Sequence, residues 1–190
     1  MTAGHIKGTI FFLLLLFLVS CAHRVESYRD SNMDFSSIKT VAVMPFANLT
    51  RETQAPDRVR DVFSTMLLAT GAVYVLPPGE TARGIARVGI ANPATPSVEE
   101  VTKLGGVLSA NAVITGVVRE YGEVRSASAA ANVISLSVEM FETQSGRVVW
   151  KAATTEGGIS IWARMFGGGG EPMDDITRKA VNDLLNDLFK

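Results

Sequence analysis

Two segments near the carboxyl end alternate between apolar and polar residues, and this pattern constrains the fold more than any other feature of the sequence. Residues 130–142 place isoleucine, leucine, valine and methionine on one side of an extended chain, and serines and a glutamate on the other. A period of two predicts a β-strand with one buried face. Residues 147–155 alternate too, and the short 144–146 link ends in glycine, so the two strands are predicted to form an antiparallel hairpin.

The rest of the body divides into apolar runs and stretches with helical spacing. Runs rich in β-branched residues predict buried strands over residues 41–44, 73–76 and 112–118. Apolar residues three and four apart predict helices that start at Pro56, near Glu80, after Ser97 and at Pro172. Ser97, with a glutamate three residues later, also has the sequence of a capping box. The order β-α-β-α-α-β-β-β-α predicts a single-domain α/β layer fold, in which helices lie mainly on one face of a mixed, mostly antiparallel sheet.

The amino terminus has the pattern of a bacterial export signal that ends at a cysteine. Residues 1–9 carry one cation, Lys7, and no acid, and residues 10–19 are continuously apolar. A basic start followed by about 7–15 apolar residues is typical of a secretory signal peptide, and a run this short is a poor membrane span. The sequence Leu18-Val19-Ser20-Cys21 resembles the bacterial lipobox. That resemblance implies cleavage between Ser20 and Cys21, a thioether-linked diacylglycerol on the Cys21 sulfur, and acylation of the new amino terminus.

Lipidation predicts where the protein lies and how it is attached. Residues 1–20 are predicted to be removed as a lipoprotein signal peptide, and two or three acyl chains on Cys21 would give long-lived membrane attachment. The alternative is an ordinary signal peptide with an incidental cysteine. Because Ala22 replaces the Asp that is associated with inner-membrane retention, we expect the lipoprotein at the periplasmic face of the outer membrane. Residues 21–38 lack an apolar period and predict a flexible tether, ahead of a folded domain over 39–190.

Three blocks of the predicted domain resemble the CsgG/LpoB group of bacterial envelope lipoproteins, which shares a fold with the amino-terminal domain of TolB. Residues 41–50 resemble the opening strand of that group. Residues 108–116 are similar to its LGADAVITG block, with Ser109 and Asn111 in place of Gly and Asp. Residues 141–150 are similar to its D-x-x-T-G-x-V-V-W hairpin. The resemblance implies a CsgG/LpoB-like α/β domain.

The resemblance also implies a class of function. Members of the group act as scaffolds of envelope machinery: some line a secretion channel, some activate a peptidoglycan synthase, and others assist the assembly of surface organelles. The resemblance therefore implies a non-catalytic adaptor or activator that works with an envelope protein, which the sequence does not identify. The alternative is a subunit of an oligomeric CsgG-like secretion channel, a homo-oligomer. Channel-forming members add long amphipathic barrel hairpins, and no matching pair is evident here.

Residue content argues against several other function classes. The chain has 18 Lys and Arg against 19 Asp and Glu, without a basic block, so nucleic-acid binding is not expected. Its two histidines are His5, in the signal peptide, and His23, in the predicted tether, so no histidine-containing triad or metal site is expected in the domain. The paired acids at 99–100 and 174–175 fall in first turns of predicted helices, where the helix dipole accounts for them. We expect no enzyme activity, no cofactor and no metal.

One stretch combines residue types that are enriched at protein interfaces. Trp162, Arg164, Met165 and Phe166 stand just before four glycines, 167–170. These side chains are candidates for contact with a partner protein or with the membrane edge, carried beside a glycine hinge. The alternative is that the stretch folds back onto the sheet as a last strand.

Overall fold

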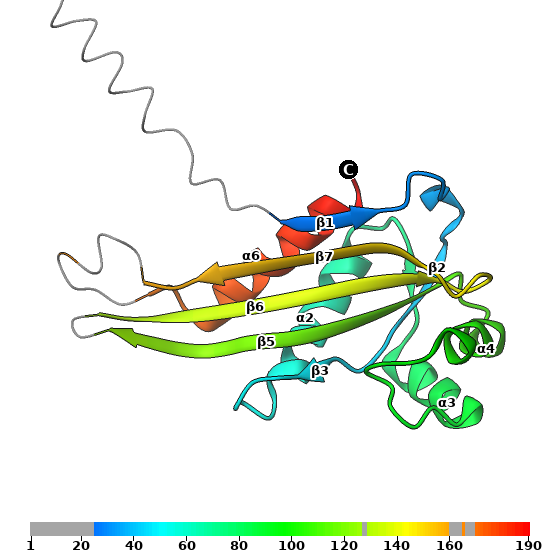
Figure 1. Ribbon diagram of the computed structural model, residues 1–190, viewed down its shortest axis with the longest axis horizontal. Coiled ribbons are helices and arrows are strands. Elements are labelled where there is room, and N and C mark those ends of the chain that lie inside the picture. The colour runs from blue at the N-terminus through cyan, green and yellow to red at the C-terminus, as the bar shows by residue number, and fades with distance from the viewer. Residues whose placement is uncertain (1–24, 127–128, 160–164, 166–169) are drawn as a thin grey trace, which may run out of the picture.

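A mixed sheet of seven strands forms the centre of the protein (Figure 1). The computed structural model describes residues 25–126, 129–159, 165 and 170–190. In sheet order the strands are β1 (Glu26–Arg29), β7 (Val148–Gly157), β6 (Ala129–Glu142), β5 (Ala112–Ser126), β2 (Thr40–Val43) and β4 (Tyr74–Val75), while β3 (Ala47–Asn48) pairs with the far part of β5. The pairs β1–β7, β7–β6 and β6–β5 are antiparallel. The pairs β5–β2, β2–β4 and β3–β5 are parallel.

The two alternating segments form the predicted antiparallel hairpin. β6 and β7 pair from Val133 opposite Gly157 to Phe141 opposite Val148. The apolar side chains of β6 that were predicted to share a face all enter one core. A bulge in this ladder brings both Val149 and Trp150 into the same core, and Trp150 is fully buried.

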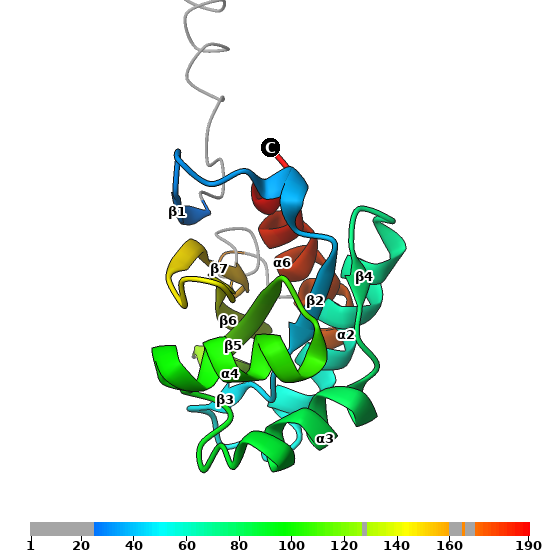
Figure 2. The ribbon, with the colours of Figure 1, turned by 90° about the vertical axis from the view of Figure 1, so that its right-hand side faces the viewer.

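Helices cover both faces of the sheet, as Figures 1 and 2 show. The two longest, α2 (Ala55–Ala69) and α6 (Met173–Leu188), pack on one face and share its core with β5, β6 and β7. The shorter α3 (Pro78–Val88) and α4 (Val98–Leu108) pack on the opposite face at one end of the sheet, over a separate core that includes Met44 and Val113. The predicted α/β fold class is therefore confirmed, and the face that holds most of the helical residues is that of α2 and α6.

The start of α4 has the predicted capping box. The Ser97 Oγ accepts a hydrogen bond from the Glu100 backbone N–H at 3.3 Å, and the Glu100 carboxylate accepts one from the Ser97 N–H at 2.7 Å. These two bonds satisfy N–H groups that the helix itself cannot pair.

The end of α4 contains the two positions where the chain departs from the LGADAVITG block. Ser109 ends the helix with a φ of 52°, a left-handed conformation that glycine adopts more easily. The Asn111 Oδ1 accepts hydrogen bonds from the backbone N–H groups of Lys39 and Thr40 at 3.0 and 2.9 Å. Asn111 thereby ties the start of β2 to the start of β5.

Residues 25–38 are docked on the body, and the prediction of a flexible tether over 21–38 is wrong for this part. β1 pairs with the edge of β7 over four residues, and the Asp30 N–H donates to the Val149 carbonyl at 2.8 Å. The 3₁₀ helix η1 (Phe35–Ser37) follows, and Ile38 is only 4% exposed. All four residues of β1 are exposed, so the strand shows no apolar period although its backbone is paired.

The predicted signal peptide and Cys21 lie outside the described residues, as do residues 22–24. Within the described ranges, no helix combines the length and the apolar content that crossing a membrane requires.

Candidate functional site

The amino-terminal segment meets the end of α6 through Arg29. The Arg29 Nη1 donates a hydrogen bond to the Leu188 carbonyl at 2.6 Å, across 159 positions of sequence. Its guanidinium carbon lies 3.7 Å from the centre of the Phe35 ring, in a cation–π contact. Because Leu188 ends a helix, its carbonyl has no partner within that helix. Arg29 therefore caps α6 and holds η1 against it.

A second link at this end of α6 is the buried carboxylate of Asp187, which is 8% exposed. Its Oδ2 accepts a hydrogen bond from the Trp150 Nε1–H at 3.1 Å, and its Oδ1 accepts one from the Lys190 Nζ at 2.8 Å. Burial raises the pKa of Asp187, but hydrogen bonds from Lys190, Trp150 and Ser27 outweigh burial, and the pKa lies below its ordinary value of 3.8. The ionised carboxylate thus joins α6 to β7 and β1.

Asp187→Asn is expected to weaken the acid dependence of stability. Because the pKa of Asp187 is lower in the folded than in the unfolded chain, its ionised form stabilises the fold above the unfolded value, and this contribution is lost as pH falls through the folded value. At neutral pH the variant should lose about 1 kcal/mol of unfolding free energy. Its difference from the wild type should shrink below about pH 5.

Urea denaturation at several pH values measures the difference in unfolding free energy between the two proteins. The contributions of the other carboxylates cancel in this difference, because both proteins carry them. Asp183→Asn, one turn earlier on α6, is the matched control. A difference between the wild type and Asp187→Asn that stays constant from pH 7 to strongly acidic pH would contradict the prediction.

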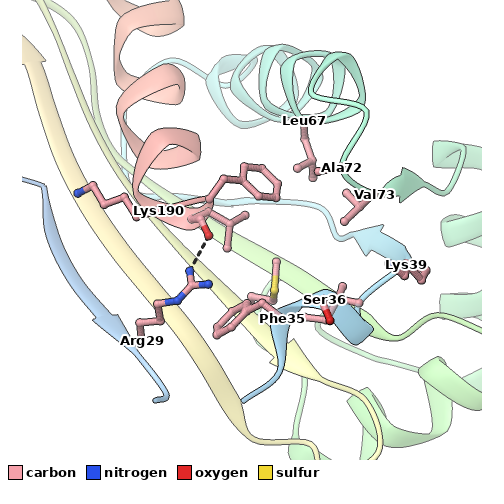
Figure 3. Close-up of a pocket in the computed structure, with 12 residues that line it drawn as sticks. Arg29, Phe35, Ser36, Lys39, Leu67, Ala72, Val73 and Lys190 are labelled. Atoms are coloured by element: carbon pink, nitrogen blue, oxygen red, sulfur yellow. Dashed lines mark hydrogen bonds between the residues drawn. The ribbon is translucent and has the colours of Figure 1, made fainter. Parts of the chain in front are cut away.

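A cavity of about 250 Å³ opens between η1, the loop after α2 and the end of α6 (Figure 3). Twelve residues line it. Its floor is apolar and buried, and is made by Ile38, Leu67, Met140 and Leu188. Its rim is exposed, and is made by Arg29, Ser36, Lys39, Ala72, Phe189 and Lys190. In Figure 3 Phe35 lies on the side opposite Leu67 and Ala72.

The lining combines apolar and cationic side chains. Three of the twelve lining residues are cations, and none is a carboxylate, an imidazole or a thiol. An apolar floor with a few polar groups at the mouth is the usual arrangement of a binding pocket. Elsewhere in the described ranges, no three His, Cys, Asp or Glu side chains are grouped so that they could hold a metal ion.

The sequence-predicted contact residues are described only in part. Cys21, Trp162, Arg164 and Phe166 lie outside the described residues. Met165 is described and is 69% exposed. The cavity itself was not predicted. Its one sequence signal is the presence of apolar residues such as Phe35 in an otherwise polar stretch.

Known proteins similar to this chain are lipoproteins or share its fold. The GNA1162-like lipoprotein family model matches residues 28–160, well over half of the chain. No curated protein sequence matches the chain. A PelC dodecamer from Paraburkholderia phytofirmans is similar in structure, with 19% identity, a TM-score of 0.59, and coverage of 87% of this chain and 98% of that chain. The lipoprotein GNA1162 from Neisseria meningitidis is similar with 16% identity, a TM-score of 0.57, and coverage of 79% and 97%.

Of the predicted resemblance to the CsgG/LpoB group, membership of a lipoprotein family is confirmed. The LpoB carboxyl-terminal domain from Salmonella enterica is a more distant neighbour, with 10% identity, a TM-score of 0.48, and coverage of 66% of this chain and 86% of that chain. The family match supports the lipoprotein part of the prediction. The CsgG part is not shown by these matches. At such low identities PelC and GNA1162 establish a shared fold.

Proposed function

Because the chain belongs to the GNA1162-like lipoprotein family, we propose that it is a non-catalytic adaptor of the bacterial cell envelope, anchored by lipid on Cys21. We also propose that it lies at the periplasmic face of the outer membrane, because Ala22, and not Asp, follows Cys21. The observation that carries the proposal is the docking of residues 25–38 on the sheet, immediately behind the lipidation motif.

The docked segment limits how far the body can stand from its anchor. β1 begins at Glu26, five residues after Cys21 (26 − 21). Five residues span at most about 18 Å, whereas a tether over 21–38 could reach about 60 Å, at 3.3–3.6 Å per residue. A lipid on Cys21 would therefore hold the folded body beside the headgroups, and a partner protein would meet it there.

The buried carboxylates support the non-catalytic part of the proposal. The Asp30 Oδ1 accepts a hydrogen bond from the Asn32 N–H at 2.9 Å, and the Arg147 Nη2 lies 3.6 Å from the Asp30 Oδ2. Asp187 is engaged by Trp150 and by Lys190, as described above. Both carboxylates thus hold the amino-terminal segment and α6 in place.

We also propose that the stretch before the four glycines, residues 162–166, contacts the partner protein. Trp162, Arg164, Met165 and Phe166 have the side-chain types that carry binding energy at interfaces. The exposure of Met165 supports this assignment.

Cell fractionation and cross-linking test the proposal. The wild type should be found in the membrane fraction, with a mass that includes the acyl groups, and cross-linking should enrich an envelope protein. Cys21→Ser should move nearly all of the protein to the soluble periplasmic fraction and remove that cross-link, because one polar side chain cannot replace buried acyl chains. Ser31→Ala, an exposed change in the docked segment, should behave as the wild type.

Two results would contradict the adaptor. One is an unmodified thiol at Cys21 in protein taken from membranes. The other is undiminished cross-linking of the same envelope protein by Cys21→Ser.

A ring-forming subunit is the second candidate function, and includes the CsgG-like secretion channel. It is favoured by the similarity to PelC, which is described as a dodecamer and whose chain is matched over 98% of its length. Native mass spectrometry of the acylated protein in detergent distinguishes the two. A mass of one copy excludes the ring, and a single higher multiple supports it.

A further inference from the structure

We propose that the cavity between η1, the loop after α2 and the end of α6 docks a protein segment that inserts one large apolar side chain and carries a carboxylate next to it. This inference rests on the proposed adaptor function and names the chemistry of its partner. Size, lining and charge each contribute to it.

The size of the cavity fits one side chain. A dry cavity of about 150 Å³ with an apolar lining accepts benzene. Pockets for drug-sized ligands measure about 300–1,000 Å³. A volume of about 250 Å³ lies between these, so it accommodates an aromatic or leucine side chain with room for adjustment.

The lining fits an apolar side chain inserted from solvent. Leu67 is fully buried at the floor, and Met140 supplies a flexible thioether that adapts to shape. Phe189 lines the cavity at its rim and remains 43% exposed, so its ring can contact a side chain that enters from solvent. A pocket with a buried apolar floor can desolvate an inserted side chain, and a few such anchors carry most of the binding energy of an interface.

The charge at the mouth selects an acidic partner. Among the three cations, Lys190 is paired with Asp187, and Arg29 is bonded to the Leu188 carbonyl. Lys39 is exposed, and among the described residues it has no ion pair within 4.0 Å. The nearby Asp34 caps η1, since its carboxylate accepts a hydrogen bond from the Ser36 N–H at 2.9 Å. Hydrogen bonding to Ser36 is the main cause of the lowered pKa of Asp34, and the charge of Lys39 is a minor cause without an ion pair within 4.0 Å. Lys39 is therefore available to a carboxylate that approaches with the apolar side chain.

Fluorescence anisotropy with the full acylated protein in detergent tests this docking site. The probe is a labelled peptide with one Phe between two Asp residues, compared with the same peptide carrying Ala for Phe or Lys for both Asp. The Phe–Asp peptide should bind at least about tenfold more tightly than either comparison peptide.

Two pairs of variants locate the binding. Ala72→Trp fills the mouth of the cavity, and its control is Ala82→Trp on the exposed face of α3. Lys39→Glu reverses the available charge, and its control is Lys103→Glu on α4. Each cavity variant should lower the affinity for the Phe–Asp peptide by about tenfold, and the affinities of the two control variants should stay within about twofold of the wild type. Circular dichroism checks that all four remain folded.

The outcomes separate this inference from the adaptor function. Failure of the Phe–Asp peptide to bind, or equal binding by Ala72→Trp and the wild type, would overturn the docking site. A third result would also overturn the docking site: the wild type binds dihexanoyl phosphatidylglycerol saturably, Ala72→Trp abolishes this binding, and the Phe–Asp peptide does not bind. The cavity would then be a lipid site. If Ala72→Trp still cross-links the envelope protein recovered with the wild type, the adaptor stands and docks elsewhere.

Discussion

Replacement of Trp150 by alanine is expected to lower the free energy of unfolding by about 3–5 kcal/mol. Among the described residues, Trp150 is the largest fully buried side chain, and it lies in the core that α6 and α2 share with the sheet. Its removal leaves a void that the packed neighbours can fill only partly. It also removes the Nε1–H donor of the buried Asp187 carboxylate. Since domains of this size have total stabilities of about 5–15 kcal/mol, the loss is a large share of the whole.

Trp150→Phe separates the two contributions. Phenylalanine keeps an aromatic ring in the core but has no donor for Asp187, so the expected loss is about 1–3 kcal/mol. Urea denaturation followed by far-ultraviolet circular dichroism measures both variants without depending on the fluorescence of Trp162. Equal losses for the alanine and phenylalanine variants would show that the void is not the main cost.

Two adjacent glycines of α4 are expected to respond in opposite directions to alanine. A Cβ added at Gly105 would lie 2.3 Å from the Cβ of Thr143, whereas one added at Gly106 would meet nothing within 4 Å. Thr143 cannot move away easily, because its hydroxyl donates to the Ala110 carbonyl at 2.7 Å. Gly105→Ala should therefore lower the free energy of unfolding by about 1–3 kcal/mol. Gly106→Ala should raise it by about 0.5–1 kcal/mol, the usual effect of alanine in a helix.

The same denaturation experiment measures this pair, and each variant controls the other for helix propensity. The two glycines share the helix and the direction of the propensity effect, and they differ in that Gly105 is buried against Thr143 whereas Gly106 is exposed. A stabilising Gly105→Ala would mean that α4 and the β6–β7 turn separate more easily than their contact implies.

Elements with a buried face could be predicted from the sequence. β6 and β7 were predicted because one side of each strand is buried, which imposes a period of two. The start of α4 was predicted because a cap depends on residues three positions apart. Both signals are local, so a single sequence contains them.

The amino-terminal docking and the cavity could not be predicted, because neither leaves a local pattern. β1 is exposed along its whole length, and its partner Trp150 is more than a hundred residues away. The contact of Arg29 with Leu188 joins opposite ends of the chain. The cavity draws residues from η1, α2, β6 and the end of α6, so its composition exists only after folding. The predicted fold class did not depend on these features.

The antiparallel pairing of β1 with β7 also determines how a pulling force on the proposed lipid anchor would reach the folded domain. Tension that enters at Val25 along the strand axis loads the β1–β7 hydrogen bonds together, in shear, instead of opening them one after another. Beyond β1, the Arg29 contact passes part of that load to α6 and so to the central core. A lateral force from the membrane would therefore act on the central core of the protein and not on a flexible linker.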